Sequence, residues 1–482
     1  MMAPTPIKYV HEGTEEFKRL GGSPVTLFSI SQLSFDTADE HMPFLFSSSD
    51  DQRAILRGLQ HRHLLFLRSV MQSVAAGVLL QGDATQTDVY APQDFLLCEG
   101  NEPKEIGDAV YYSLHSPKLP SRILGLRVHK QADGTPSAYP NQKTTHVYVQ
   151  DVIAHIQPSK TSSSFKLETQ FPSSALKPGF PTAKPPGGVS IECLTGDRRM
   201  NLTSIQSLLM NGHSLTVERD LPDATLEDFV QTSSSLQSVD CLNYDRQVCV
   251  LLLQILVGSQ HLYISGSATE LKPRKIFLVW PKRLKEQAGN MREQDTNRLK
   301  VDMECEKAEE KGKIQKLWRT HGSPRVVLTP LSSASTVPRP FTYMKSQIEG
   351  IIGYCLHSHE SLTSLASGPT LPKSSYRKGL FYLASLLHCG KDMADMVAML
   401  QVILWGPRPP LFDHRCLTTT TVHNWLTIKR ALLVMKLAER GQIQDQSALD
   451  WEDCLWIQYL SSTDPEAILS LTRQLWLSLN AS

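Results

Sequence analysis

Cysteine and histidine side chains bind metals and serve as catalytic nucleophile and base, so their spacing is informative. The stretch GYCLHSHE, residues 353–360, contains Cys355, His357 and His359. Apolar residues at helical spacing predict a helix over 343–360 with Cys355 on its apolar face. Because successive helical residues advance by about 100°, His359 shares that face and His357 points away. We therefore expect a buried cysteine and two polar residues at a helix end, and no metal site.

A second candidate for chemistry is FDHRC, residues 412–416, which places Asp413, His414 and Cys416 in a proline-rich loop between predicted helices. A catalytic cysteine needs a base within hydrogen-bonding distance and an oxyanion donor opposite. Proximity in the sequence establishes neither requirement. We expect a loop aspartate and histidine that cap helix ends, and we predict no catalytic residue here.

The motifs of several large enzyme classes are absent. The sequence has no G-x-x-x-x-G-K-[ST] to hold phosphates, no G-x-G-x-x-G, no H-E-x-x-H and no G-x-S-x-G. An enzyme would need a site assembled from dispersed residues, which we keep as the third interpretation. We expect no cofactor.

A basic segment provides the strongest local charge. Residues 272–319 contain fourteen Lys or Arg and eight Asp or Glu, and most of the excess lies in KPRKIFLVWPKRLK. Phosphate groups bind such clusters, so this segment is a candidate nucleic-acid-binding site. The candidate residues are Lys272, Arg274, Lys275, Lys282, Arg283 and Lys285.

Tryptophan is concentrated at the C-terminal end, where residues 405–476 contain five of the seven in the chain. Most of them alternate with Leu and Ile on predicted helices and should lie in the core. Trp451 differs because Asp450, Glu452 and Asp453 surround it at a predicted helix start, where acidic residues suit the helix dipole. An exposed Trp451 would indicate a partner-binding surface, and these four residues are our partner-binding candidates.

The elements that would position these residues fall into several regions. After a flexible N-terminus (1–24), residues 25–156 predict an α+β domain with strands at 25–30, 122–128 and 146–156 around one long helix. Ser49 is positioned to cap that helix and Gly82 to end it. Leu56, Leu59 and Leu67 belong to its predicted apolar face.

Residues 157–188 contain six prolines and predict a linker or long loop. A second α+β unit follows over 189–329, although it is equally interpreted as the remainder of the first. It is predicted to contain short strands and one or two helices, at 189–194, 202–210, 214–220, 248–257, 261–265, 275–280 and 325–329, and a charged insertion over 283–320.

After a short linker (330–340), residues 341–482 predict an all-α domain that folds by itself. Its six expected helices span 343–360, 376–389, 392–405, 420–440, 448–461 and 465–479. Asp392 and Asp464 are expected caps, and Gly390 and Gly441 are expected helix ends.

Composition limits the function classes. The chain has 482 residues and a formal charge of +1, so any binding to nucleic acid or membrane must be local. The charged N-terminus does not resemble a signal peptide, and the apolar runs at 64–80 and 248–257 are interrupted or too short to span a membrane. Nine cysteines without paired spacing fit reduced thiols. We expect an intracellular protein, cytoplasmic or nuclear.

These observations favour α+β N-terminal and middle regions with a mainly α-helical C-terminal domain. The simplest function is a non-enzymatic adaptor or scaffold subunit of an intracellular complex, whose protein partners bind the helical domain. A nucleic-acid-associated factor is the second interpretation, and an enzyme with a dispersed site is the third.

The second interpretation makes a salt-dependent prediction. Each lysine or arginine that contacts a phosphate releases counterions, so the slope of log K against log salt should be about −0.7 to −0.9 per contact. Neutralising Lys282, Arg283 and Lys285 together should flatten this slope in a filter-binding or anisotropy titration with RNA or DNA. If the protein showed no salt-sensitive binding to RNA or DNA at low ionic strength, the interpretation as a nucleic-acid-associated factor would be wrong.

Overall fold

A computed structural model describes residues 52–79, 90–98, 102–128, 146–157, 205–233, 240–267, 269–280, 303–330, 340–357, 374–389, 391–407, 418–443, 446 and 449–480. The chain divides into two compact units, Met1–Phe66 and Leu67–Ser482, with the boundary inside helix α2 (Gln52–Leu79). All other described helices and strands belong to the second unit.

Sheet A is antiparallel, with strand order β1-β3-β4-β6-β5 and with β2 paired to β3. Its strands are β1 (Leu96–Leu97), β2 (Lys104–Ile106), β3 (Ala109–Ser116), β4 (Leu119–Val128), β5 (Val152–Ile156) and β6 (Leu215–Glu218). Side chains such as Leu114, Leu126 and Val217 form one core, to which the short helix α3 (Ile205–Met210) adds Ile205 and Leu208. The stretches predicted at 122–128, 146–156 and 214–220 therefore contain strands.

Sheet B contains β7 (Ala224–Thr225), β8 (Ile276–Val279) and β9 (Arg325–Leu328), paired antiparallel in that order. The connection from β8 to β9 includes helix α8 (Met303–His321), within the predicted charged insertion. Trp318 of α8 packs against Phe229 of helix α4 (Leu226–Thr232), with ring centroids 5.7 Å apart. The end of the insertion is therefore fixed to the protein core by an aromatic contact.

Helix α6 (Cys241–Ile264) is the most buried helix of the described chain. Asp240 caps it by accepting a hydrogen bond from the amide of Asn243 at 3.2 Å. It is long and apolar enough to cross a membrane by length and composition, but most of its apolar stretch is buried inside the protein. This burial is typical of the central helix of a globular core.

The six helices predicted near the C-terminus are all present, and each begins and ends within about three residues of its expected position. They are α9 (Pro340–His357), α10 (Ser375–His388), α11 (Met393–Trp405), α12 (Thr419–Glu439), α13 (Trp451–Ser462) and α14 (Pro465–Asn480). The expected caps also form, because Asp392 accepts from the amide of Met393 and Asp464 from that of Glu466. Gly441 follows α12 with a φ of 67°.

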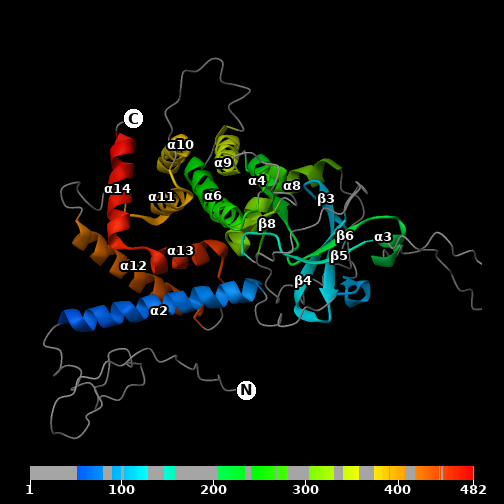
Figure 1. Cartoon of the computed structure of the whole chain (residues 1–482), viewed down its shortest axis with the longest axis horizontal. Coiled ribbons are helices and arrows are strands. Elements are labelled where there is room, and N and C mark those ends of the chain that lie inside the picture. The colour runs from blue at the N-terminus through cyan, green and yellow to red at the C-terminus, as the bar shows by residue number, and fades with distance from the viewer. Residues whose placement is uncertain are drawn as a thin grey trace, which may run out of the picture. The chain divides into compact units, whose positions relative to one another are not determined.

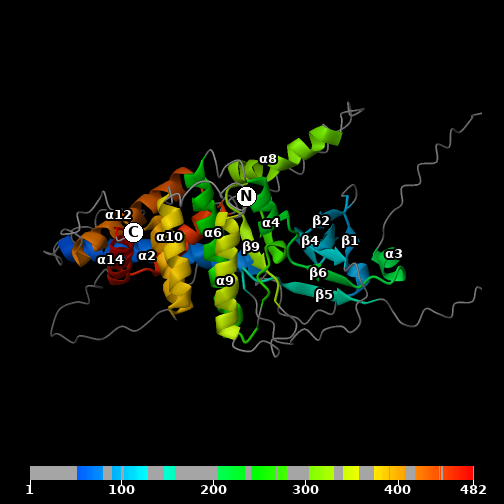
Figure 2. The same ribbon diagram turned by 90° about the horizontal axis from the view of Figure 1, so that it is seen from above.

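The C-terminal helices share their core with the preceding region. Helices α9, α10 and α11 pack along α6 (Figures 1 and 2). The resulting cluster joins Leu252 and Ile255 of α6 to Ile348, Leu380 and Leu400. The core is thus continuous across the linker placed at 330–340, because α6 supplies the apolar surface that these three helices bury.

Helix α2 is present as predicted, but its contacts differ from those expected for a helix surrounded by N-terminal strands. Leu67 and Val70 are buried, and Arg68 donates a hydrogen bond to the carbonyl of Ser461 in α13 at 3.3 Å. Leu56 and Leu59, expected on the apolar face, are exposed by 52% and 43%. The second half of α2 therefore packs on C-terminal helices, and the helix is not the centre of an N-terminal domain.

Several expectations concern residues outside the described ranges. These are the N-terminal segment 1–24, the stretches at 25–30 and 189–194, most of the linker 157–188, the residues of FDHRC, and Gly390. His359 lies outside them too. The remaining domain boundaries stay predictions.

A tight turn after α8 anchors the start of α13. Gly322 has a φ of 75°, and its carbonyl accepts a hydrogen bond from the Trp280 indole at 2.9 Å. The amide of Trp451 donates to the carbonyl of Ser323 at 3.4 Å. A Cβ at Gly322 would lie 2.2 Å from Asp450 Oδ2, and Asp450 is the N-cap of α13. Any residue other than glycine at position 322 would therefore displace the Asp450 cap.

Replacing Gly322 by alanine should destabilise the protein more than the same change at Gly266. Both glycines have positive φ, so alanine at either costs about 1 kcal/mol or more. A Cβ at Gly266 has no atom within 4 Å, whereas at Gly322 it displaces Asp450 and should cost about 1 kcal/mol more through loss of the cap. Denaturant unfolding of the two variants measures the difference. Equal losses would contradict this role of the turn.

Candidate functional site

Apolar side chains fill the space where sheet A meets sheet B. We call this group the inter-sheet cluster; its members are Ile106, Ala109, Tyr111, Leu221, Phe277 and Val327. Tyr111 of β3 and Phe277 of β8 are 0% and 1% exposed, and their rings meet edge to face with centroids 5.9 Å apart. The two sheets are thus in direct side-chain contact at this cluster.

The backbones also approach closely at this junction. Gly107, between β2 and β3, has a φ of 64°, and a Cβ there would lie 2.5 Å from the carbonyl oxygen of Arg274. Arg274 belongs to the turn Pro273–Lys275 that leads into β8. The tip of the β2–β3 hairpin therefore rests directly on the turn before β8, because glycine leaves room for the contact.

A buried ion pair lies beside the inter-sheet cluster. Arg127 of β4 and Glu218 of β6 approach to 3.8 Å, and the Arg127 guanidinium lies 5.9 Å from the centre of the Phe277 ring. Glu218 is only 3% exposed. Burial raises the pKa of Glu218 to about 7, although Arg127 acts in the opposite direction. Burial also raises the pKa of the neighbouring Tyr111 hydroxyl.

A second charged group connects sheet A to sheet B. The arginine–aspartate network consists of Asp151, Arg219, Asp220 and Arg325. Arg219, which is 2% exposed, contacts Asp220 at 3.1 Å and Asp151 at 3.7 Å, and Arg325 of β9 pairs with the other oxygen of Asp220. Burial acts to raise the pKa of Asp220, but Arg325 and Arg219 outweigh it and lower that pKa. Asp220 therefore stays ionised.

The same arginines hold a backbone segment. Arg219 donates to the carbonyl of Val149 at 3.1 Å, and Arg325 donates to the carbonyl of Val147. The amide of Arg219 donates to the carbonyl of Asp151 at 3.0 Å. Because these charges are used for internal bonds, the network positions the chain around 147–151 and is not arranged as a catalytic site.

The acidic residues around Trp451 have partners within the chain. Glu452 pairs with Arg246, Asp453 pairs with Lys436, and Asp450 caps α13 through the amide of Asp453 at 2.8 Å. Burial raises the pKa of both Asp450 and Glu452.

Trp451 itself is half-buried. Its indole nitrogen donates to the Tyr148 hydroxyl at 3.1 Å, and the ring lies 5.6 Å from the Arg325 guanidinium. Its role in partner binding stays a prediction, and the structure adds a role in packing.

The basic candidates are partly neutralised. Lys272 and Lys275 both pair with Glu270, and Arg274 pairs with Glu227 at 2.6 Å. Lys282, Arg283 and Lys285 lie outside the described residues. Three of the six charges are therefore paired with carboxylates, which weakens the case for a phosphate-binding patch, and nucleic-acid binding stays a prediction.

The residues that opened the sequence analysis do not assemble a site in the described chain. Cys355 is 1% exposed, burial raises the pKa of its thiol to about 12, and its carbonyl accepts a hydrogen bond from Tyr244 at 2.8 Å. Within the described ranges no three His, Cys, Asp or Glu side chains are placed to hold a metal ion.

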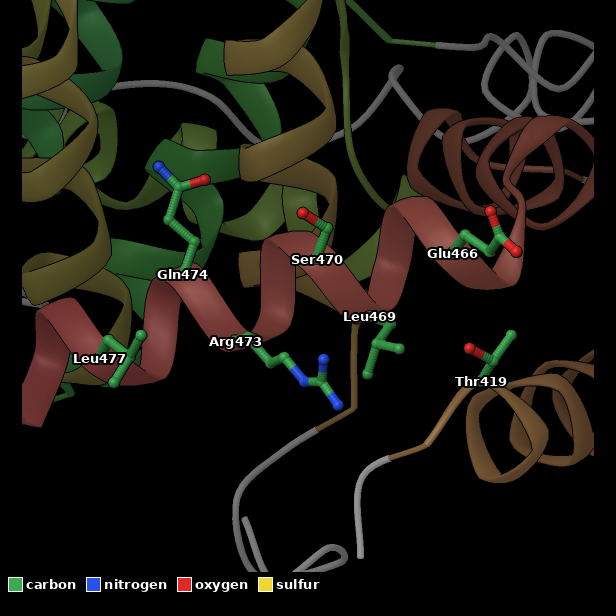
Figure 3. A pocket seen from close by; sticks show the side chains of 7 residues that line it. All are labelled: Thr419, Glu466, Leu469, Ser470, Arg473, Gln474 and Leu477. Carbon is green, nitrogen blue, oxygen red and sulfur yellow. The ribbon is translucent and has the colours of Figure 1, made fainter. Parts of the chain in front are cut away.

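A shallow hollow lies on the outer face of α14. Figure 3 shows that Glu466, Leu469, Ser470, Arg473, Gln474 and Leu477 line it from α14 and that Thr419 adds a side chain from the start of α12. Gln474 donates to the Tyr382 hydroxyl at 2.9 Å. The lining residues include neither a cysteine nor a histidine, and Leu469 and Leu477 make part of the hollow apolar.

The fold can now be compared with known structures. A crystal structure of the pseudokinase PEAK1 (Sugen Kinase 269) aligns with a TM-score of 0.52 over 87% of this chain and 100% of that chain, at 21% identity. The fold resembles that of a pseudokinase. No family model matches the chain.

Two curated proteins illustrate the similarity in sequence. The inactive tyrosine-protein kinase PRAG1 of Rattus norvegicus is 25% identical over 486 residues, which cover 89% of this chain and 33% of that protein. The inactive tyrosine-protein kinase PEAK1 of Homo sapiens is 27% identical over 301 residues, which cover 56% of this chain and 17% of that protein. This chain thus spans about a third or less of the length of these relatives.

The pseudokinase-like fold allows a direct search for kinase motifs. Active protein kinases use a Gly-rich loop, a V-A-I-K lysine, H-R-D, D-F-G and A-P-E to bind Mg–ATP and position the reacting groups. None of these motifs occurs in the 482 residues. The inter-sheet cluster could not be predicted from the sequence, because its members come from five separate segments and no local pattern connects them.

Stability should depend on pH through Glu218. The unfolded chain loses this proton near pH 4.5 and the folded chain near pH 7, so between these values the folded state binds more protons and the Glu218 contribution falls as pH rises. Glu218→Gln cannot titrate. Relative to the wild type, this variant should therefore gain up to about 3 kcal/mol of stability between pH 4.5 and 7.

Denaturant unfolding at several pH values provides the measurement. Glu102→Gln, a change of the same kind at an exposed position, is the matched control and should track the wild type. If the stability difference between Glu218→Gln and the wild type were constant across this pH range, Glu218 would not titrate as described.

Proposed function

We propose that this chain is a non-catalytic scaffold with a pseudokinase-like fold, which binds protein partners through its C-terminal helices. The observation that carries the proposal is the inter-sheet cluster. Tyr111 and Phe277 are in direct ring contact at this junction. We infer that this packing leaves no room for Mg–ATP between the two sheets.

The hairpin contact supports the same conclusion. The β2–β3 hairpin lies against the carbonyl of Arg274 at Gly107, so its tip contacts protein and adds to the packing between the two sheets. The curated relatives carry the word inactive in their names, which agrees with a role without catalysis, although this chain covers only part of them.

The C-terminal helices supply an unoccupied apolar surface. Ile428, Leu432 and Met435 of α12 are 58%, 51% and 56% exposed. Their spacing of four and three residues places them on one side of the helix, opposite the buried Leu433 and Leu437. Exposed apolar stripes of this kind mark protein-binding surfaces, and a partner helix with an apolar face fits this geometry.

The proposed scaffold acts inside the cell, in the cytoplasm or the nucleus. The described cysteines, including the exposed Cys389, are all free thiols. Free thiols are usual in a reducing compartment, where disulfides do not persist.

Nucleotide binding is the direct test of the closed junction. A ligand that binds only the folded state raises its stability according to concentration and affinity. We expect millimolar Mg–ATP to leave the melting temperature of the purified chain unchanged. A saturable rise in melting temperature, reversed by removing Mg²⁺, would contradict a junction filled by Tyr111 and Phe277.

Partner binding is tested on the α12 stripe. Leu432→Asp should leave the melting temperature within a few degrees of wild type, because the side chain is half-exposed. It should reduce recovery of stoichiometric partners, or of a second copy of the chain, in affinity purification and light scattering. His423→Asp adds the same charge to another exposed side of α12 and is the control. If both variants recovered partners equally well, the α12 stripe would not be the partner-binding surface.

A further inference from the structure

A separate cavity of about 260 Å³ lies against the second half of α2. Its walls come from α2, from residues 146–148, from α6 and from α13, and they include Met71, Ala75, His146, Tyr148, Trp451 and Gln458. It contains no member of the inter-sheet cluster and none of the exposed residues of α12. A cavity of about 150 Å³ accepts benzene, so this volume suits a molecule of two fused rings.

The cavity wall carries no net charge. Its lining consists of aliphatic, aromatic, amide, thiol and imidazole side chains. Burial, His261 and Arg219 together lower the pKa of His146 to about 4, so this imidazole is neutral at pH 7. Burial raises the pKa of the Cys454 thiol, which stays protonated. An occupant with a formal charge would lose its hydration without gaining a counterion.

Three aromatic side chains form one rigid part of the wall. His146 stacks on His261 with ring centroids 4.2 Å apart and meets Tyr148 edge to face at 5.4 Å. Tyr148 meets Trp451 edge to face at 5.9 Å, and their polar ends are joined by the 3.1 Å hydrogen bond. Preorganised aromatic surfaces favour flat ligands, since rings bind there with little loss of side-chain freedom.

The cavity also has polar groups that remain available. In the described part of the chain, the side-chain amides of Gln72 and Gln458 make no hydrogen bond. The Nδ1 atom of His146 accepts a hydrogen bond from the amide of Tyr148 at 3.3 Å. The neutral ring therefore carries its proton on Nε2, which is a donor. A ligand carbonyl or ring nitrogen matches these donors.

We propose that this cavity binds a small, uncharged, bicyclic heteroaromatic molecule with a hydrogen-bond acceptor, and that its occupant links α2 to α13. Because such a molecule contacts both helices, binding stabilises the docking of residues 71–75 on α13. The site is independent of the proposed scaffold function, since neither the inter-sheet cluster nor Leu432 lines it.

Quinolin-2-one is a suitable probe because it is neutral, flat and bicyclic and carries a carbonyl acceptor. We expect saturable binding to the full chain with a dissociation constant below about 1 mM, measured by calorimetry and saturation-transfer NMR. The anion 2-naphthoate has a similar shape and should bind at least tenfold more weakly.

Three variants locate the binding. Ala75→Phe fills the cavity and should weaken quinolin-2-one binding at least tenfold, whereas Ser73→Phe introduces the same side chain on α2 away from the lining and should not. His146→Phe keeps an aromatic ring and removes the Nε2 donor, and it should weaken binding at least threefold.

The proposal is overturned if quinolin-2-one shows no saturable binding to the wild type, or if Ala75→Phe binds it as the wild type does. Binding of 2-naphthoate with equal affinity would also overturn it. If Ala75→Phe does not fold, as judged by its melting temperature, two measurements still test the site. These are the affinity of His146→Phe for quinolin-2-one and the affinity of the wild type for 2-naphthoate.

Discussion

The pairing of Arg219 and Arg325 with Asp220 holds the two sheets in their mutual arrangement. Arg219 and Asp220 follow directly after β6 of sheet A, whereas Arg325 begins β9 of sheet B. A buried charge without a partner costs several kcal/mol, so any movement that separates the sheets would expose or isolate these groups. The same two arginines donate hydrogen bonds to the carbonyls of Val147 and Val149. These bonds hold the segment before β5 against the junction.

This constraint explains why the junction is filled instead of open. With β6 and β9 held by ion pairs, Tyr111 and Phe277 come into ring contact and the Arg127–Glu218 pair is buried behind them. In a fold that resembles a pseudokinase, this packing supports the proposed non-catalytic role. In the proposed scaffold, the α12 stripe and the α2–α13 cavity are two candidate binding features of the described chain.

The α12 stripe lies on a C-terminal helix, and the C-terminal helix α13 forms one wall of the cavity. Trp451 makes internal packing contacts and also lines the cavity. Its amide binds the turn at Ser323, its indole binds Tyr148, and its ring faces both Arg325 and the cavity. One residue therefore contacts the turn after α8 through its backbone, and the segment before β5 and the arginine–aspartate network through its side chain.

The sequence by itself determined the local elements. The six C-terminal helices, helix α2, and strands β4, β6, β8 and β9 were predictable because apolar periodicity, caps and glycine terminators act over a few neighbouring residues. The mixed α and β character and the absence of enzyme motifs were also evident. The expectation of a non-enzymatic protein rested on the same local evidence.

Only the tertiary structure decided how these elements combine. Tyr111 contacts Phe277, which lies 166 positions further along the sequence, and Arg68 contacts Ser461 near the other end of the chain, so no local pattern contains either contact. For the same reason, the sequence does not show that α2 contacts α13 or that α6 shares apolar contacts with α9, α10 and α11. Apolar periodicity shows that a helix has a face to bury, but it does not specify which distant element covers that face.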